Sequence, residues 1–355
     1  MHEFPDELQI GRFREELFAW SDQNPRPLPW KGENDPYKIW LSEIILQQTR
    51  VEQGLPYYQK FIAAYPSIHH LAEAPEDELL KHWEGLGYYA RARNMHAAAR
   101  YIARELDGKF PTSYETIRAL KGVGDYTAAA IASFAFGLPH AVVDGNVYRV
   151  LARRWGIKIP SDSNAGRKYF AALAQALLDP LRPGAHNQAM MDFGATCCTP
   201  QQPLCMFCPF RAECVAFNSD QLRELPVKSK ALVRKKRDFI YLIINHDDHV
   251  LVRKRTGDDI WKGLWEFPQI EKLPEKLPFK GQLIHISAPY RQQLTHQEVT
   301  AVFCEVYLSD NEYPDALDHS LLADCERVAR KNLKKNIAFP RVIASYLENN
   351  VLTLR

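Results

Sequence analysis

Four cysteines that lie close together constrain what this chain can fold into more than any other feature. The spacing C-x6-C-x2-C-x5-C joins Cys198, Cys205, Cys208 and Cys214. One CxxC pair with longer arms suits a cubane iron–sulfur cluster, whereas structural zinc usually takes two short CxxC pairs. We therefore expect residues 198–214 to hold a 4Fe–4S cluster in an architectural role, with structural zinc as the alternative. Cys197 is a neighbouring fifth cysteine to which the sequence assigns no role.

The first part of the 355-residue chain has the periodicity of helices. Apolar side chains recur at helical spacing over 37–45 and 147–154, and 171–178 is rich in helix formers. Short breaks that carry proline or glycine separate these segments. We interpret residues 1–220 as an all-α domain that ends with the cysteine loop.

The character of the sequence changes near residue 220, where a basic linker is expected over 221–237. Runs of aromatic and β-branched residues then predict strands at 239–245, 250–253, 282–287 and 299–308. The segment 321–346 is predicted to be helical, with a break at Pro340. The fold class is therefore α+β, with a smaller α+β domain over 238–355.

Composition is ordinary for a soluble globular protein, with 46% hydrophobic and 25% charged residues. The longest apolar run, 128–138, is too short to span a bilayer, and the N-terminus lacks an apolar signal region. We expect a cytoplasmic protein without a membrane partner. The net charge of +2 does not by itself indicate nucleic-acid binding. The stretch 227–237 holds six basic residues and no acidic one, which suits a linker along a phosphate backbone and equally a solvated linker.

Two glycines, Gly122 and Gly124, stand just before a predicted helix in the sequence LKGVGDYTA, residues 120–128. Without side chains, they let backbone N–H groups approach a phosphate, helped by the dipole of the helix that follows. A plain tight turn is the commoner explanation of such a pair. The flanking helices and the downstream cysteine loop favour phosphate binding.

These features together resemble the endonuclease III superfamily of base-excision DNA glycosylases. The resemblance rests on the helix–hairpin–helix at 120–128, the sequence VDGN at 143–146 and the four-cysteine loop. Further segments resemble the MutY-type adenine glycosylases with their C-terminal MutT-like domain: LPW at 28–30, PYKIWLSEIILQQT at 36–49, WEGLGYY at 83–89 and IWKGLWEFP at 260–268. The resemblance implies a helix–hairpin–helix glycosylase domain, a Nudix/MutT-like domain, and a monomer that acts on duplex DNA near a bacterial nucleoid.

One position separates the branches of this superfamily. Bifunctional relatives with lyase activity place a lysine nucleophile just before the Thr-Ala of the hairpin helix, where this chain has Tyr126. Without that amine, a Schiff base with the opened sugar is not available. The resemblance thus implies a monofunctional glycosylase that hydrolyses the N-glycosidic bond of adenine mispaired with 8-oxoguanine or guanine. No REx2EE pattern follows 260–268, so we expect no Nudix hydrolase chemistry.

Cleavage of an N-glycosidic bond needs one carboxyl group that protonates the leaving base and one carboxylate that faces the developing oxocarbenium charge. Glu43 lies in an apolar helix, where burial could keep it protonated, although a lone glutamate is more often an ordinary surface residue. Asp144 precedes Gly145 and a helix, so a plain helix N-cap is the alternative. By resemblance, Glu43 is the general acid and Asp144 the stabiliser or transient nucleophile.

The resemblance implies roles for further residues. Tyr126 and Asn146 would hydrogen-bond around the carboxylates, and the flipped adenine would lie in a pocket formed by Leu28, Trp30 and Gln188. DNA would be contacted by the glycine hairpin and by residues that fill the gap or lie near the opposite base: Gln48, Thr49, Leu86 and Tyr88. The sequence Leu294-Thr295-His296 corresponds to the Phe-Ser-His loop that checks for 8-oxoguanine, with leucine as a departure. Core packing is the alternative for the apolar members.

Two other functions remain open from the sequence. One is an endonuclease III-like glycosylase/lyase for oxidised pyrimidines, which Tyr126 and the MutT-like segment disfavour. The other is an iron–sulfur protein that senses damaged DNA without cutting it, which the motifs around Glu43 and Asp144 disfavour.

Overall fold

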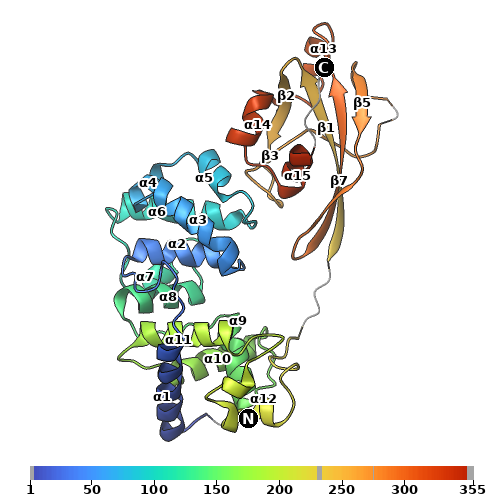
Figure 1. Ribbon diagram of the computed structural model, residues 1–355. Coiled ribbons are helices and arrows are strands. Elements are labelled where there is room, and N and C mark those ends of the chain that lie inside the picture. The colour runs from blue at the N-terminus through green and yellow to red at the C-terminus, as the bar shows by residue number, and fades with distance from the viewer. Residues whose placement is uncertain (1–3, 230–233, 275, 350–355) are drawn as a thin grey trace. The chain divides into compact units, whose positions relative to one another are not determined.

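The computed structural model describes residues 4–229, 234–274 and 276–349 (Figure 1). The chain forms two compact units: Met1–Ala72 with Ala97–Ala231, and Glu73–His96 with Leu232–Arg355. The second unit thus takes in a helical segment from the N-terminal half in addition to the C-terminal region. The first unit is helical and the second contains the sheet.

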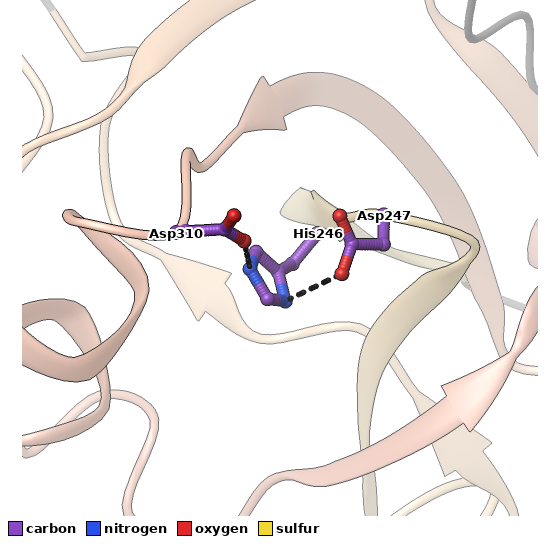
Figure 2. A group of neighbouring side chains, drawn as sticks. All are labelled: His246, Asp247 and Asp310. Carbon is purple, nitrogen blue, oxygen red and sulfur yellow. Dashed lines mark hydrogen bonds and ion pairs between the residues drawn. The ribbon is translucent and has the colours of Figure 1, made fainter.

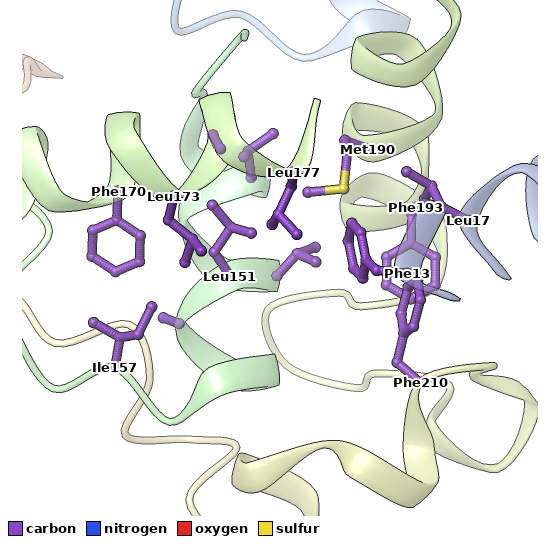
Figure 3. Packing of buried hydrophobic residues seen from close by; sticks show 14 of the residues in the cluster. Phe13, Leu17, Leu151, Ile157, Phe170, Leu173, Leu177, Met190, Phe193 and Phe210 are labelled. Carbon is purple, nitrogen blue, oxygen red and sulfur yellow. The ribbon is translucent and has the colours of Figure 1, made fainter. Parts of the chain in front are cut away.

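The first unit is built from helices, several of which pack around a shared apolar core. Their bounds are α1 Glu7–Gln23, α2 Pro36–Leu46, α3 Val51–Ala64, α7 Tyr114–Arg118, α8 Asp125–Phe136, α9 Gly145–Trp155, α10 Asn164–Leu177, α11 Pro183–Thr196 and α12 Val215–Asn218, with 3-10 turns at Cys205–Phe207 and Arg211–Glu213. Two further helices, α4 Ile68–Glu73 and α6 Ala90–Glu105, cross the division between units. Figure 3 shows Phe13, Leu151 and Phe193 among the side chains of this core. The helices predicted at 37–45, 147–154 and 171–178 are confirmed by α2, α9 and α10.

The predicted glycine hairpin lies between α7 and α8. Gly122 has φ +82°, a left-handed conformation that favours glycine, and Gly124 is the N-cap residue of α8. No side chain caps this N-terminus, because glycine cannot accept from the first N–H groups of α8. The hairpin therefore leaves backbone donors at the positive end of a helix dipole, as phosphate binding requires.

The second unit is built on a mixed sheet with the strand order β3-β2-β1-β7-β5. Its strands are β1 Lys235–His246, β2 His249–Lys254, β3 Trp265–Glu266, β4 Gln269–Ile270, β5 Gln282–Ile286, β6 Tyr290–Gln293, β7 Gln297–Tyr307 and β8 Glu326–Ala329, and its helices are α5 Glu76–Trp83, α13 Tyr313–Leu317, α14 Arg330–Asn336 and α15 Arg341–Asn349. The central strands β1 and β7 run parallel. Side chains alternate across them, so Tyr241 and Phe303 pack with Tyr346 of α15 on one face, while Leu242 and Val306 form a separate core on the other.

The strand predictions at 239–245, 250–253, 282–287 and 299–308 are confirmed, with two differences nearby. The helical segment predicted over 321–346, with a break at Pro340, is wrong at Glu326–Ala329, because those residues pair antiparallel with β2. The predicted linker 221–237 ends earlier, because Lys235 begins β1 and pairs with Gln297 of β7. Residues 230–233 of that linker lie outside the described residues.

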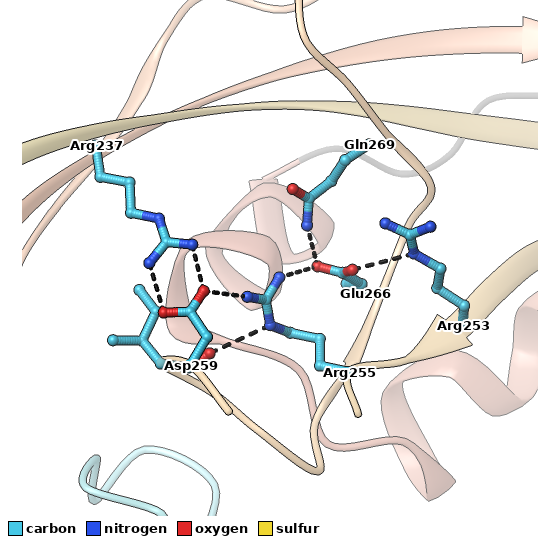
Figure 4. Close-up of polar contacts among 7 residues, drawn as sticks. Arg237, Arg253, Arg255, Asp259, Glu266 and Gln269 are labelled. Atoms are coloured by element: carbon cyan, nitrogen blue, oxygen red, sulfur yellow. Dashed lines mark hydrogen bonds and ion pairs between the residues drawn. The ribbon is translucent and has the colours of Figure 1, made fainter. Parts of the chain in front are cut away.

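A polar network fixes the segment between β2 and β3 to the sheet (Figure 4). Glu266 is 3% exposed, and its carboxylate accepts hydrogen bonds from Arg253 at 3.1 Å and also from Arg255 and Gln269. Asp259 accepts from Arg237 at 2.6 Å. The buried carboxylate is therefore paired with cations, as a buried charge requires.

A helix that crosses a bilayer needs about 20 apolar residues. Helix α1, one of the longer helices among the described residues, has 17 residues. Within that part of the chain, no helix combines the length and the apolar character that crossing a membrane requires.

Candidate active site and nucleic-acid interface

Glu43 lies in the last turn of α2, a helix that is buried on nearly every side. Asp35 caps this helix by accepting from the Tyr37 N–H at 2.9 Å, and the apolar residues that follow carry it into the core. Glu43 is only 5% exposed, which excludes the surface glutamate considered above. The hydroxyl of Tyr126, from α8, donates a hydrogen bond of 2.6 Å to Glu43 Oε2.

The surroundings of Glu43 favour its protonated form. The pKa of Glu43 is raised to about 7, mainly because the residue is buried. The Tyr126 hydrogen bond lowers this pKa, and the nearby Asp144 charge raises it. A carboxyl group with a pKa near neutrality can give a proton to a leaving group and take one back. This is the property that a general acid needs for the chemistry expected from the sequence.

Asp144 is the N-cap residue of α9, and its carboxylate is fixed by two donors. One oxygen accepts from the Val147 N–H and the other from Asn146 Nδ2, each at 2.7 Å. Burial raises the pKa of Asp144, while these hydrogen bonds and the Arg149 charge oppose the shift. The N-cap interpretation is therefore confirmed, and the cap holds the carboxylate still.

Arg149, which was not predicted from the sequence, connects this site to the cysteine loop. Its guanidinium donates to Asn146 Oδ1 at 2.8 Å and to the carbonyls of Gly194 and Cys198, both at 2.7 Å. A Cβ at Gly194 would lie 2.6 Å from the Cβ of Asn146, so α11 approaches α9 too closely for a larger residue. The signal in the sequence is the i, i+3 spacing from Asn146 to Arg149 on one helix face.

A cavity of about 1110 Å³ in the first unit joins two catalytic candidates, Tyr126 and Asp144, to the hairpin, whereas Glu43 and Asn146 are not among its lining residues. Five predicted residues line it: Gln48, Gly122, Gly124, Tyr126 and Asp144. Tyr148 and Arg167 also line it, and neither was predicted. The hairpin donors and the fixed carboxylate thus face one hollow, as a site for a DNA strand requires.

Gln48 and Thr49 follow α2 in a tight turn. Gln48 holds φ +56°, in the left-handed region that is uncommon for a residue with a side chain, and the Thr49 N–H donates to the Leu46 carbonyl at 3.0 Å. Strained backbone of this kind persists where the surroundings enforce it, often at functional sites.

The residues expected in an adenine pocket do not line this cavity. Trp30 packs edge-on against Tyr58 at a centroid distance of 5.3 Å, and Leu28 is partly buried. Gln188 donates to Asp192 at 3.1 Å, and the same buried carboxylate pairs with Lys31. Asp192 was not predicted, although it stands four residues after Gln188 on α11.

The second unit contains a pocket of about 500 Å³ where the other DNA-binding candidates gather. Leu86, Tyr88, Thr295 and His296 all line it, and the hydroxyls of Tyr88 and Thr295 are in contact. The Tyr88 side chain is 44% exposed and its φ is +48°. Trp261 also lines this pocket and was not predicted from the sequence.

Cys198, Cys208 and Cys214 pack against the helical core, and none of the four predicted cysteine ligands forms a disulfide. Burial raises the pKa of the Cys198, Cys205 and Cys214 thiols, and the Cys205 thiol interacts with the other three predicted ligands. Arg153 points its guanidinium at Cys198 Sγ, 3.5 Å away. Such a group of thiols beside a cation fits a metal cluster, whose thiolates carry negative charge. Cys197 is buried and hydrogen-bonded to Cys208.

A separate group in the second unit contains His246, Asp247 and Asp310. Figure 2 shows the two carboxylates on opposite edges of the imidazole, 3.1 Å from Nε2 for Asp310 and 3.8 Å from Nδ1 for Asp247. Arg327 also pairs with Asp247 at 3.4 Å. Each carboxylate thus faces a different nitrogen of the same imidazole ring.

The fold and this site together define a DNA glycosylase of base excision repair. Residues 41–175 match the HhH-GPD superfamily of base excision DNA repair proteins, and residues 239–349 match the NUDIX domain. A thermostable thymine-DNA glycosylase of known structure is 30% identical, with a TM-score of 0.55 over 59% of this chain and 97% of that one. An endonuclease III–DNA complex has the same fold, with a TM-score of 0.52 at 21% identity over the same shares of the two chains.

Curated relatives narrow the class to one family. The adenine DNA glycosylase of Buchnera aphidicola is 36% identical over 76% of this chain and 79% of its own length. That of Rattus norvegicus is 43% identical over 89% of this chain and 73% of its own. The chain belongs to the adenine DNA glycosylase family, whose members remove adenine in DNA repair, and its partner is DNA.

Proposed function

We propose that this enzyme excises adenine paired with 8-oxoguanine, or with guanine, and that it does so by hydrolysis without cutting the strand. The observation that carries the proposal is the pairing of Glu43 with Tyr126 beside the fixed carboxylate of Asp144. Two carboxyl groups whose surroundings differ are what glycosidic-bond hydrolysis requires.

Each carboxyl group takes one role in this proposal. Glu43, whose pKa of about 7 leaves much of it protonated, gives a proton to N7 of the departing adenine and later assists water. Asp144, held by Val147 and Asn146, faces the sugar and stabilises its developing positive charge or bonds to it transiently. Tyr126 orients Glu43 through its hydroxyl.

Tyr126 also supports hydrolysis over lyase chemistry. A lyase needs an amine that attacks the sugar carbon after base loss, and a phenol at this position cannot form a Schiff base. The hydroxyl is already engaged with Glu43 at 2.6 Å. The product is therefore an abasic site in an intact strand.

Recognition of the mispair involves the DNA-binding candidates described above for each unit. Flipping the adenine costs a few kcal/mol of stacking, and Gln48 and Tyr88, both with left-handed backbone, fill the space it leaves. Thr49, Leu86, Thr295 and His296 lie near the opposite base, and the Thr295 hydroxyl hydrogen-bonds 8-oxoguanine. Leu28, Trp30 and Gln188, which lie outside the lining of the catalytic cavity, would surround the extruded adenine.

Four cysteines, Cys198, Cys205, Cys208 and Cys214, would hold a 4Fe–4S cluster. Three of them, Cys198, Cys208 and Cys214, pack against the helical core, and the Cys205 thiol interacts with all three, which supports this assignment. The cluster would hold the loop against α9 and would have a structural role. In this proposal it takes no part in proton transfer or in cleavage of the glycosidic bond.

Single-turnover cleavage of three duplexes tests the proposal: adenine opposite 8-oxoguanine, adenine opposite thymine, and thymine glycol opposite adenine. Each reaction is stopped with and without alkali, which cuts the strand at abasic sites. We expect breaks in the first duplex alone, and only after alkali.

The other outcomes identify the two competing functions. Breaks in the thymine glycol duplex without alkali would move the enzyme to the glycosylase/lyase branch. Tight binding to the first duplex without any break would indicate a damage sensor.

A further inference from the structure

A second hollow of about 820 Å³ lies beside the catalytic cavity in the first unit. The two hollows share four lining residues, Asp144, Gly145, Tyr148 and Arg167. They therefore meet at the first turn of α9, where the Asp144 carboxylate is fixed. We call the second hollow the basic groove, because five of its lining residues are arginine or lysine.

The cations of the basic groove are of two kinds. Arg149 and Arg153 are buried and donate to backbone carbonyls, so they hold the protein together. Arg167, Arg223 and Lys228 are exposed and extend their charges toward solvent. Arg167 also donates to the Asp162 carbonyl at 3.1 Å, which restricts its direction.

Two carboxylates line the same groove, and both are engaged. Asp144 is occupied as the cap of α9, and Asp162 accepts from the backbone N–H and the hydroxyl of Ser229 at 2.8 and 2.9 Å. The exposed side chains of the groove are therefore predominantly cationic. An open surface of this charge suits a flexible polyanion better than a small buried ligand.

We propose that the basic groove binds phosphates of the DNA strand that carries the excised adenine, on the side of the flipped nucleotide away from the glycine hairpin. The catalytic cavity contains the hairpin donors of Gly122 and Gly124 at one place and Asp144 at another. A strand whose sugar faces Asp144 has a phosphate on either side of that sugar. The backbone donors of the hairpin bind the phosphate on one side of the sugar. Arg167, Arg223 and Lys228 bind the phosphate on the other side.

The inference rests on the proposed position of the sugar at Asp144, and it holds whichever base stands opposite the adenine. It adds Arg167 and Arg223, which no sequence motif indicated, and it gives Lys228 of the basic stretch 227–237 a defined place. These contacts position the strand and carry no base specificity, since phosphates are the same at every step.

The first experiment measures binding against salt. Fluorescence anisotropy gives the Kd for a duplex with a tetrahydrofuran abasic analogue and for a fully paired duplex, over about 0.05–0.3 M salt. Replacing Arg167, Arg223 and Lys228 together by alanine should lower the slope of log K against log salt by about 3, one for each phosphate that the variant no longer neutralises. The affinity at low salt should fall by at least about tenfold for both duplexes.

The matched control replaces Arg104, Lys109 and Lys168 by alanine, three exposed cations of the first unit that line neither hollow. This variant loses the same formal charge, so a general electrostatic effect would appear in both. Melting temperatures of the two variants, together with the single change R223E, separate a binding defect from a folding defect.

The second experiment locates the bound phosphates on the DNA. Single phosphates on both sides of the abasic analogue are replaced by neutral methylphosphonates. The enzyme should lose affinity at phosphates on both sides, and the triple variant should become insensitive on one side while keeping its sensitivity on the hairpin side.

Two results would overturn the proposal. One is a triple variant with the salt slope of its control. The other is a variant that stays sensitive to every methylphosphonate to which the enzyme responds. Loss of 8-oxoguanine preference alone would contradict the proposed function and leave the groove assignment intact, because the groove is tested on a duplex without a target base.

Discussion

The hydroxyl of Tyr126 donates a 2.6 Å hydrogen bond to the carboxyl group of Glu43, across a separation of 83 residues in the chain. This hydrogen bond joins the start of the hairpin helix α8 to the buried helix α2. It places a phenol against the proposed general acid, at the position where bifunctional relatives are expected to carry an amine. Because the phenol stabilises the ionised carboxylate, it sets the pH range over which Glu43 keeps its proton.

The change Tyr126→Phe should move the pH dependence of excision. Loss of the hydroxyl removes the interaction that lowers the pKa of Glu43, so burial and Asp144 raise it further above about 7. The alkaline limb of the single-turnover rate should then shift to higher pH, while Tyr101→Phe, a change at an exposed tyrosine, leaves the limb in place. An unmoved limb in Tyr126→Phe would show that Glu43 is not the group that titrates.

The change Glu43→Gln should abolish excision and alter stability with pH. The pKa of Glu43 is raised from 4.5 to about 7 on folding, so its stabilising contribution is complete below pH 4.5 and is lost as pH rises to about 7. Ionisation of the buried carboxyl then costs up to about 3 kcal/mol, which glutamine avoids. The free energy of unfolding of the Glu43→Gln variant, relative to that of the parent, should therefore rise between pH 4.5 and about pH 8.

Chemical denaturation at both pH values measures this difference. Glu115→Gln, at an exposed position on α7, is the control, and its stability relative to the parent should be the same at both pH values. If Glu43→Gln follows the parent at both pH values, Glu43 is not held protonated by burial.

Two substitutions at Asp144 separate its cap from its charge. Asparagine caps a helix about as well as aspartate, so Asp144→Asn should keep the melting temperature near that of the parent, whereas Asp144→Ala should lose about 1 kcal/mol. Both should lose excision and retain binding to the mispair. At Asp6, the cap of α1, the same two changes should reproduce the stability difference without affecting excision. If Asp144→Asn cleaved at the native rate, excision would not depend on the negative charge of Asp144.

Substitution of single cysteines tests the ligand set. Cys214→Ala should lose the broad absorbance near ~400 nm that marks an iron–sulfur cluster, together with bound iron. Cys197→Ala, the matched change at the neighbouring buried cysteine, should keep both. Equal loss of colour in the two variants would mean that Cys197 belongs to the ligands, and a colourless parent containing zinc would favour the structural zinc site.

Interactions within a few residues could be predicted from the sequence. The cap formed by Asp144 was predicted, since its partners Asn146 and Val147 lie in the next turn. The strands of the second unit were predicted from their composition, but β8 was not, because Glu326–Ala329 becomes a strand only by pairing with β2. Local pattern specifies local geometry, and edge pairing depends on a partner distant in sequence.

The site divides in the same way. The sequence by itself determined the cysteine spacing, the hairpin glycines and the identity of the carboxylates, since these are properties of neighbouring residues. Only the tertiary structure decided that Glu43 is buried against Tyr126, that Arg149 joins Asn146 to Cys198, and that the basic groove opens beside Asp144. Burial, pKa and cavity shape arise from segments that meet only when the helices pack, and no window of the sequence contains them.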